Sequence, residues 1–294
     1  MRRQEARVFY LFLTPWAIGF LLFGAGPILA SLALSFTDYN IVGAPIFNGI
    51  ENYRHLLTSD DLFPVTFGNT IYYTVIAVPG QIMVAFGLAL LLNLKVRAVA
   101  VYRTFFYLPS IVPAVASSVL WIWILQPQWG LLNSALHFFG IEGPLWLGSL
   151  EWSKPALILM ALWSSGGTMI IFLAGLQGVP QHLYEAAMID GANRWQRFWN
   201  VTVPMMTPTI FFTLILGIIG SFQVFTAAYI MTNGGPSNTT LFYLLYLYRQ
   251  AFNFLNMGYA SAMAWLLLIV ILLLTLVQLW LAPRWVYYEG GIRR

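Results

Sequence analysis

Long apolar stretches alternate with short polar segments along the whole chain. Six of the stretches are long enough to cross a bilayer, which takes about 20 helical residues. They cover approximately residues 8–36, 68–93, 104–126, 155–178, 205–231 and 258–283, and none of them contains an Asp, Glu, Lys or Arg. The pattern predicts an all-α integral membrane protein with six transmembrane helices in one domain over residues 1–294.

Two segments allow a different reading. Residues 241–254 are apolar and aromatic, but with 14 residues and Arg249 among them they are too short to span and suit an interfacial or re-entrant piece. The first stretch begins after basic residues, as a signal peptide does. Its apolar part is longer than a signal peptide needs, so we expect an uncleaved anchor, with cleavage near Ala30 as the alternative.

Composition supports the membrane assignment. Hydrophobic residues make up 60% of the 294 residues and charged residues only 8%, with a mean hydropathy of +0.75. Soluble domains carry about 25% charged residues. Both an ordinary soluble enzyme and a disordered chain are therefore excluded. The sequence contains no Cys, which also excludes disulfides and thiolate chemistry.

The basic residues predict the orientation. Eleven of the 14 fall on one side of the six stretches, namely Arg2, Arg3, Arg7, Lys95, Arg97, Arg103, Arg194, Arg197, Arg284, Arg293 and Arg294. Arg54, Lys154 and Arg249 fall on the other side. Because cytoplasmic loops carry an excess of Lys and Arg, both termini are expected in the cytoplasm.

The spans lack the groups that membrane chemistry requires. All ten carboxylates and all three His lie in predicted loops, and there is no phosphate-binding Gly-x-x-x-x-Gly-Lys-Ser/Thr run. An integral-membrane enzyme has no candidate catalytic group, and a proton-driven transporter has no intramembrane acid. A neutral solute moved with energy from another chain fits best. An ion-coupled secondary transporter that binds sodium through carbonyl groups remains the alternative, and a scaffold without transport is a third hypothesis.

Residues 179–204, between the fourth and fifth spans, predict a short helix–turn–helix. Pro180 suits the first turn, and Leu183, Ala186, Ala187 and Asp190 share one face. Gly191 can take the left-handed cap, and Asn193 can cap a second helix before Pro204 returns to the membrane. The two Ala permit close approach and Glu185 offers a charge, so this loop is either a docking site or an interfacial loop.

The residues Glu185-Ala186-Ala187, then Asp190-Gly191-Ala192, Phe198, Pro204 and Pro208, resemble the EAA loop of bacterial ABC importer permeases. Further stretches resemble the carbohydrate-uptake (MalF/UgpA-like) permeases over essentially the whole chain. These are residues 232–236 (TNGGP), Tyr246-x-Tyr248 with Ala251-Phe252, residues 35–39 (SFTDY) and residues 49–53 (GIENY).

This resemblance implies a type I ABC importer permease fold and a complete transport system. Its partners would be a second homologous permease, two copies of a cytoplasmic ABC ATPase and a periplasmic or lipid-anchored solute-binding protein. This chain would hold no cofactor, since ATP and Mg belong to the ATPase. The ATPase-coupling residues would be Glu185 as the charged contact, Ala186 and Ala187 as the packed face, Asp190 as local structure and Gly191 as the turn.

The resemblance also implies that the fourth and fifth spans contact the solute, a sugar or related polyol. Hydroxyls and amides can replace the water contacts of a sugar, and aromatic faces can cover its C–H surface. The candidate pathway residues are Trp163, Ser164, Gly167, Gly220, Ser221, Gln223 and Val224. Trp163, Ser164 and Gly167 are expected on one helical face, and Gly217, Gly220, Ser221 and Val224 on another. Helix packing through small residues is the alternative explanation.

Overall fold

The computed structural model of the chain describes residues 2–94 and 97–287. Within them, four helical stretches are long and apolar enough to cross a membrane: Arg7–Leu34, Leu62–Leu92, Arg194–Met231 and Met257–Trp285. Two further pairs of helices meet the same criteria only when each bent pair is taken as one span. The predicted helical membrane protein is confirmed. Lys95, Arg293 and Arg294, used in the orientation argument, lie outside the described residues.

The third predicted span, residues 104–126, is not one straight helix. It consists of α5 (Val99–Ile111) and α6 (Ala114–Ile124), which meet at an angle of 100°. Pro113 explains the break, because a residue that precedes proline is driven out of the helical region. Val112 accordingly has φ −66° and ψ 130°. A bend at a proline inside this span is what the missing backbone N–H of proline leads one to expect.

The fourth predicted span is bent less strongly. It consists of α8 (Ser153–Trp163) and α9 (Gly166–Gln177), which meet at 45°. The break falls at Ser164 and Ser165, and the Ser165 hydroxyl donates a 2.6 Å hydrogen bond to the Leu162 carbonyl. Beyond the break, Gly166 approaches α5 so closely that a Cβ there would overlap the Phe106 carbonyl oxygen.

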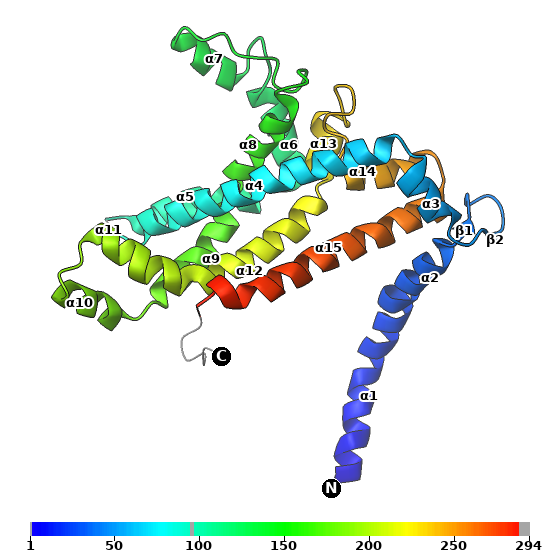
Figure 1. The fold of residues 1–294 in the computed structure, drawn as a ribbon, viewed down its shortest axis with the longest axis horizontal. Coiled ribbons are helices and arrows are strands. Elements are labelled where there is room, and N and C mark those ends of the chain that lie inside the picture. Colours follow the sequence, from blue (N-terminus) through cyan, green and yellow to red (C-terminus); the bar gives the residue numbers. More distant parts are fainter. Residues whose placement is uncertain (1, 95–96, 288–294) are drawn as a thin grey trace. The chain divides into compact units, whose positions relative to one another are not determined.

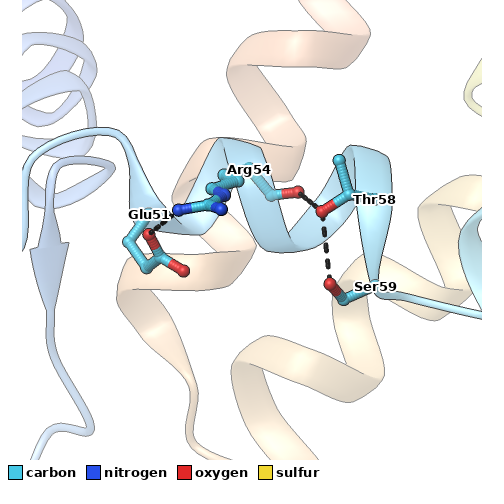
Figure 2. Close-up of polar contacts among 4 residues, drawn as sticks. All are labelled: Glu51, Arg54, Thr58 and Ser59. Carbon is cyan, nitrogen blue, oxygen red and sulfur yellow. Dashed lines mark hydrogen bonds and ion pairs between the residues drawn. The ribbon is translucent and has the colours of Figure 1, made fainter.

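The chain divides into two compact units, of which the first comprises residues 1–63 and 246–269. It holds α1 (Arg2–Phe20), a π-helical turn (Leu21–Ala25), α2 (Gly26–Leu34), a hairpin of β1 (Thr37–Asp38) and β2 (Ile46–Phe47), and α3 (Glu51–Thr58). Strands β1 and β2 are antiparallel, with Thr37 opposite Phe47. Figure 2 shows the exposed side of α3, where Arg54 lies 3.9 Å from Glu51 and the Thr58 hydroxyl donates to the Arg54 carbonyl.

The second unit comprises residues 64–245 and 270–294. Its main elements are α4 (Leu62–Leu92), α5, α6, α8, α9 and α12 (Val203–Phe222), and one apolar cluster joins α4, α9 and α12 (Figure 1). That cluster is fully buried at Ala85, Ala89, Met169, Phe172 and Met206. The small alanines of α4 let the larger side chains of α9 fit against it, as expected where helices pack closely in a membrane.

The connection between α6 and α8 forms a self-contained loop around Asn133, which lies on α7 (Leu131–Phe138). The Asn133 amide donates to the carbonyls of Pro127 and Pro144, and its oxygen accepts a 2.6 Å hydrogen bond from the Trp146 indole. After α12 come α13 (Thr226–Met231), α14 (Tyr243–Tyr248), a π-helical turn (Arg249–Asn253) and α15 (Met257–Trp285). The segment 241–254 is therefore two short helical pieces and not a span, as its length predicts.

Candidate functional site

The connection between α9 and α12 begins with helix α10 (Gln181–Ile189), which extends away from the ends of its neighbours in Figure 1. Pro180 is extended, with ψ 128°, and directly precedes the helix instead of lying in its first turn. The helix ends at Gly191, whose φ is +78°. Ala192 N–H donates to the Ala187 carbonyl at 2.9 Å and Gly191 N–H to the Met188 carbonyl at 3.1 Å. This pair is a Schellman cap, which confirms the predicted left-handed glycine.

A new helix starts directly after Asn193. The Asn193 side chain accepts from Gln196 N–H at 2.9 Å, and the Gln196 side chain accepts from Asn193 N–H at 2.8 Å, which completes a capping box. Asn193 is thus confirmed as a cap. The helix is α11 (Arg194–Arg197), and it continues through a π-helical turn (Phe198–Thr202) into α12.

The predicted second helix is present, and it runs on without a break from Arg194 to Phe222, through the π-helical turn and α12. Pro204, which was expected to mark the return to the membrane, lies in the first turn of α12. The π-helical turn directly before Pro204 lets the helix pass a residue that has no backbone N–H. The connection therefore consists of α10 and a tight turn. The helix that follows the turn begins before the apolar region and continues into α12.

The outward face of α10 carries His182, Glu185, Ala186 and Ile189, which are all exposed and lie at helical spacing. Ile189 exposes 87% of its surface. The Glu185 carboxylate accepts a 2.9 Å hydrogen bond from the Gln181 amide. An acid, a small residue and an exposed aliphatic residue therefore lie together, with nothing of this chain covering them among the described residues.

The predicted face of α10 is corrected by this exposure. Leu183 and Ala187 are half-buried, whereas Ala186 and Asp190 are exposed. The four residues expected on one face therefore divide between the inner and outer sides. Sequence reasoning also missed Ile189. Its position four residues after Glu185 could have identified it, because an aliphatic side chain there lies on the same face as the acid.

The inner side of α10 and the start of α11 are anchored to the core. The Tyr184 hydroxyl lies 2.9 Å from the Thr202 hydroxyl. An aromatic chain then leads inward, since the Phe198 ring lies 5.7 Å from the Trp195 ring and 6.2 Å from Phe86, which is 5.3 Å from the buried Phe172. A displacement of α10 would therefore be transmitted to α4 and α9 by packed side chains.

A cavity of about 340 Å³ lies between α4, α9 and α12. Its walls are mostly apolar, with hydroxyl and amide groups at intervals. Thirteen residues line it: Tyr73, Ala77, Val78, Gln81, Ile82, Thr168, Ile171, Thr213, Leu216, Gly217, Gly220, Ser221 and Val224. Ser221 is held in place, because its hydroxyl oxygen lies 2.9 Å from both the Ile218 carbonyl oxygen and the Thr74 hydroxyl oxygen, within hydrogen-bond distance of each.

The cavity brings together some of the predicted pathway residues and not others. Gly220, Ser221 and Val224 line it, together with Gly217, as their expected common face requires. Trp163, Ser164, Gly167 and Gln223 do not line it. Trp163 ends α8 and Gly167 lies on α9, so the break at Ser164 interrupts the single helix on which their common face was expected.

Sequence reasoning missed the contribution of the second span to this cavity. Tyr73 and Gln81 on α4 line it, and the Gln81 amide donates a 2.8 Å hydrogen bond to the Ala161 carbonyl of α8. Gln81 stands in a span otherwise dominated by apolar residues. A polar amide in such a span seeks a partner inside the bundle, so its isolated position was the available signal.

Comparison with known proteins supplies independent evidence. Residues 81–287 match the model of the family described as binding-protein-dependent transport system inner membrane component. The chain is 42% identical over 292 residues to the probable ABC transporter permease protein YesP of Bacillus subtilis, covering 98% of this chain and 94% of that one. It is 36% identical to the lactose transport system permease protein LacF of Rhizobium radiobacter, with 93% of each chain covered.

A third relative is the sulfoquinovosyl glycerol transport system permease protein SmoG of Agrobacterium fabrum, 34% identical over 92% of this chain and 88% of that one. Among solved structures, the fold is similar to a chain of a bacterial alginate ABC transporter in complex with an alginate pentasaccharide-bound periplasmic protein. That likeness has a TM-score of 0.83 at 24% identity and covers 96% of each chain. At this identity it concerns the fold.

Proposed function

The chain belongs to the family of binding-protein-dependent transport system inner membrane components, and on that premise we propose that α10 couples it to an ATPase that drives sugar import. The chain is a membrane-embedded permease subunit of a sugar ABC importer. The observation that carries the proposed coupling is the outward face of α10. It presents Glu185, Ala186 and Ile189 on a helix whose other side is tied to the core.

Coupling requires that a partner bind α10 and that a displacement of α10 be transmitted to the membrane helices. The exposed Glu185 supplies a charge, Ala186 allows close approach, and Ile189 supplies apolar area that a groove would cover. Gly191 and the capping box of Asn193 hold the turn after α10 in one shape. ATP and its Mg would be held by the partner ATPase, so hydrolysis takes place outside this chain.

The cavity between α4, α9 and α12 supports a route for the solute. Its hydroxyl and amide groups can replace the water around sugar hydroxyls, and its apolar walls suit the C–H surfaces. Relatives are named for lactose, for trehalose and maltose, and for sulfoquinovosyl glycerol. In this proposal the route is lined by the predicted residues Gly220, Ser221 and Val224. The cavity adds Gln81 of α4 and Thr168 of α9 to its walls.

The remaining partners follow from the same family. One permease chain encloses a pathway only together with a second, so a homologous permease completes the channel. Two ATPase copies would serve the two permeases, and a periplasmic or lipid-anchored binding protein would deliver the solute. The solved alginate transporter was determined with a periplasmic protein, which supports this composition.

The test uses Glu185→Ala in the complete transporter, with Gln181→Ala as the matched control. The control removes the hydrogen bond to Glu185 but keeps the carboxylate. We expect Glu185→Ala to insert normally while its ATPase no longer co-purifies and uptake falls more than tenfold. Loss of one partner of a buried charge contact costs about 2–5 kcal/mol.

Unchanged ATPase attachment and uptake in Glu185→Ala would overturn the coupling role. Uptake that persists after ATP depletion and follows a cation gradient would instead support the ion-coupled transporter. In Gln181→Ala we expect both ATPase attachment and uptake to stay close to the unsubstituted chain. If the control loses attachment as well, the hydrogen bond and not the charge of Glu185 holds the helix surface together.

A further inference from the structure

The connection between the first span and α3 is an apolar hairpin that the proposed transport function does not explain. Residues 39–50 contain no charged residue, and five of them are large aliphatic or aromatic side chains that stand exposed. Val42 exposes 87% of its surface, Phe47 78% and Ile46 70%; the other two are Ile41 and Ile50. An exposed apolar group of this kind marks a surface that contacts something other than water.

The hairpin is rigidly held at the end of α2. The Asn52 amide donates to the carbonyls of Ser35 and Thr37, both at 2.9 Å, and the Tyr53 hydroxyl donates to the Ser35 hydroxyl at 2.8 Å. Ser35 is fully buried and directly follows the last residue of α2. The hairpin therefore starts at the level where the first span ends.

A second span fixes the same level independently. Gly258, in the first turn of α15, donates its N–H to the Tyr39 carbonyl at 3.0 Å. A Cβ at Gly258 would overlap the Thr37 carbonyl oxygen, so β1 lies directly against the beginning of α15. The hairpin is thus located at the ends of two apolar helices, α2 and α15, which is the boundary between hydrocarbon and headgroups. Figure 1 shows β1 and β2 next to the end of α2.

Local hydrogen bonds direct the apolar side chains outward. The Asn40 side chain accepts from Gly43 N–H at 3.1 Å and the Asn40 carbonyl accepts from Val42 N–H at 2.8 Å, which closes the turn. Gly49, with φ +65°, turns the chain out of β2 into α3. Asn48 N–H donates to the Phe36 carbonyl at 3.0 Å, which ties the end of β2 back to the residues that follow α2.

We propose that this hairpin is an interfacial membrane anchor, with Val42, Ile46 and Phe47 inserted at the headgroup–acyl boundary of the leaflet in which α2 ends. The occupant of this surface is lipid, because the surface continues the ends of two apolar spans and residues 39–50 carry no charge. The one charged residue of the hairpin is Asp38, in β1, which is exposed at the start of the hairpin. Interfacial segments of this kind bury their apolar side about 5–10 Å into the boundary. The anchor would hold the outer ends of α2 and α15 at a fixed depth.

The absence of Cys from the sequence permits a direct test by spin labelling. Single cysteines replace Val42, Phe47 and, as a control, Ser59, and the full chain is placed in lipid nanodiscs. Ser59 belongs to the same compact unit, is exposed and follows the polar helix α3 (Figure 2). Collision rates with oxygen, which partitions into lipid, are compared with those of a water-soluble nickel chelate.

We expect the oxygen-to-nickel collision ratio to be several-fold higher at Val42→Cys and Phe47→Cys than at Ser59→Cys. Ratios at all three positions equal to that of Ser59→Cys would overturn the proposal, because they would place the hairpin in water. Protection of the two labels from both reagents would also overturn it, since that result indicates burial against a protein chain. A second variant, Val42→Asp, should lower the ratio at Phe47→Cys if insertion of the hairpin is cooperative.

Discussion

Gly191 lies in open space at φ +78°, with no atom within 4 Å of a Cβ built on it. Glycine is therefore needed at position 191 for its positive φ, and not because a side chain would lack space. We expect Gly191→Val to impair uptake and ATPase coupling, because a left-handed backbone costs an ordinary residue about 1–2 kcal/mol and a β-branched residue more. Gly191→Asn should remain close to normal, since Asn tolerates this region. Uptake assays on both variants check the prediction, and equal loss in the two would refute it.

The turn around Gly191 could be predicted from the sequence because residues close to it in the chain determine its shape. Asp190-Gly191 and Asn193 followed by Gln196 determine a cap and a turn within a few residues of sequence. Ile189 is different. Whether an isoleucine faces solvent depends on where α10 lies relative to the core, and Tyr184, Phe198 and Phe86 decide this from separate parts of the chain.

Two neighbouring glycines on α9 offer a sharp comparison. A Cβ at Gly166 would overlap the Phe106 carbonyl of α5, whereas one at Gly167 would meet only the Ser110 side chain, at 3.8 Å. We expect Gly166→Ala to destabilise the fold by about 1–3 kcal/mol through overpacking. Gly167→Ala should change stability little. Thermal unfolding of the purified chain in detergent measures both, and equal shifts in the two variants would contradict the close approach of α5 and α9.

Asp60 ties α14 and α15 to the start of α4. Its carboxylate accepts a 2.7 Å hydrogen bond from the Tyr246 hydroxyl, another from the Tyr259 hydroxyl, and one from Leu62 N–H at 2.9 Å. Burial, and then the neighbouring Asp60 carboxylate, raise the pKa of Tyr246 above its ordinary value of about 10. Tyr246 thus keeps its proton in the folded chain after the unfolded chain has lost it.

The raised pKa of Tyr246 makes the folded state less stable as the pH rises above about 10. The stabilisation is complete below the ordinary tyrosine pKa, about 10, and is lost as pH rises from there toward the folded-state pKa, because the unfolded state then binds fewer protons. We expect the free energy of unfolding to fall less steeply above pH 10 in Tyr246→Phe than in the unsubstituted chain. Unfolding measured at several alkaline pH values tests this, with Tyr248→Phe as control. Identical slopes in all three proteins would refute the role of Tyr246.

The helical elements themselves were anticipated where apolar length alone decides them. The predicted second and sixth spans correspond to α4 and α15, although α4 begins six residues earlier than expected, at Leu62. In the third span, the sequence does not show which proline bends the helix. Pro109 and Pro113 both lie in it, yet Pro109 sits inside α5 while Pro113 accompanies a 100° bend. Hydropathy does not distinguish these two prolines.

The arrangement of charges predicts one orientation for the whole chain. If both termini are cytoplasmic, Ser59 lies outside and Arg194 inside. We expect a membrane-impermeant maleimide to label Ser59→Cys but not Arg194→Cys in intact cells. In inverted vesicles the pattern should reverse, and both sites should react after detergent is added. The opposite pattern in intact cells would show that the positive residues lie outside and would invert the assignment of α10.

Membrane residence, helical class and family follow from the sequence alone. Six long uncharged stretches leave a polypeptide no stable alternative to lipid-embedded helices, since every backbone group must be paired within its own segment. Short motifs such as Glu185-Ala186-Ala187 with Gly191 are equally local, so they are readable without coordinates.

The tertiary structure decided which residues meet. The cavity unites Gln81, Thr168 and Ser221 from three helices, and no spacing along the chain relates them. The bend at Ser164 placed Trp163 and Gly167 on different helices, and the π-helical turn before Pro204 joined α11 directly to α12. The cavity in particular depends on contacts between segments that are distant in the chain. Hydrophobic length determines that a segment is a membrane helix, but only the packing of one helix against another determines which side chains it turns toward a common space.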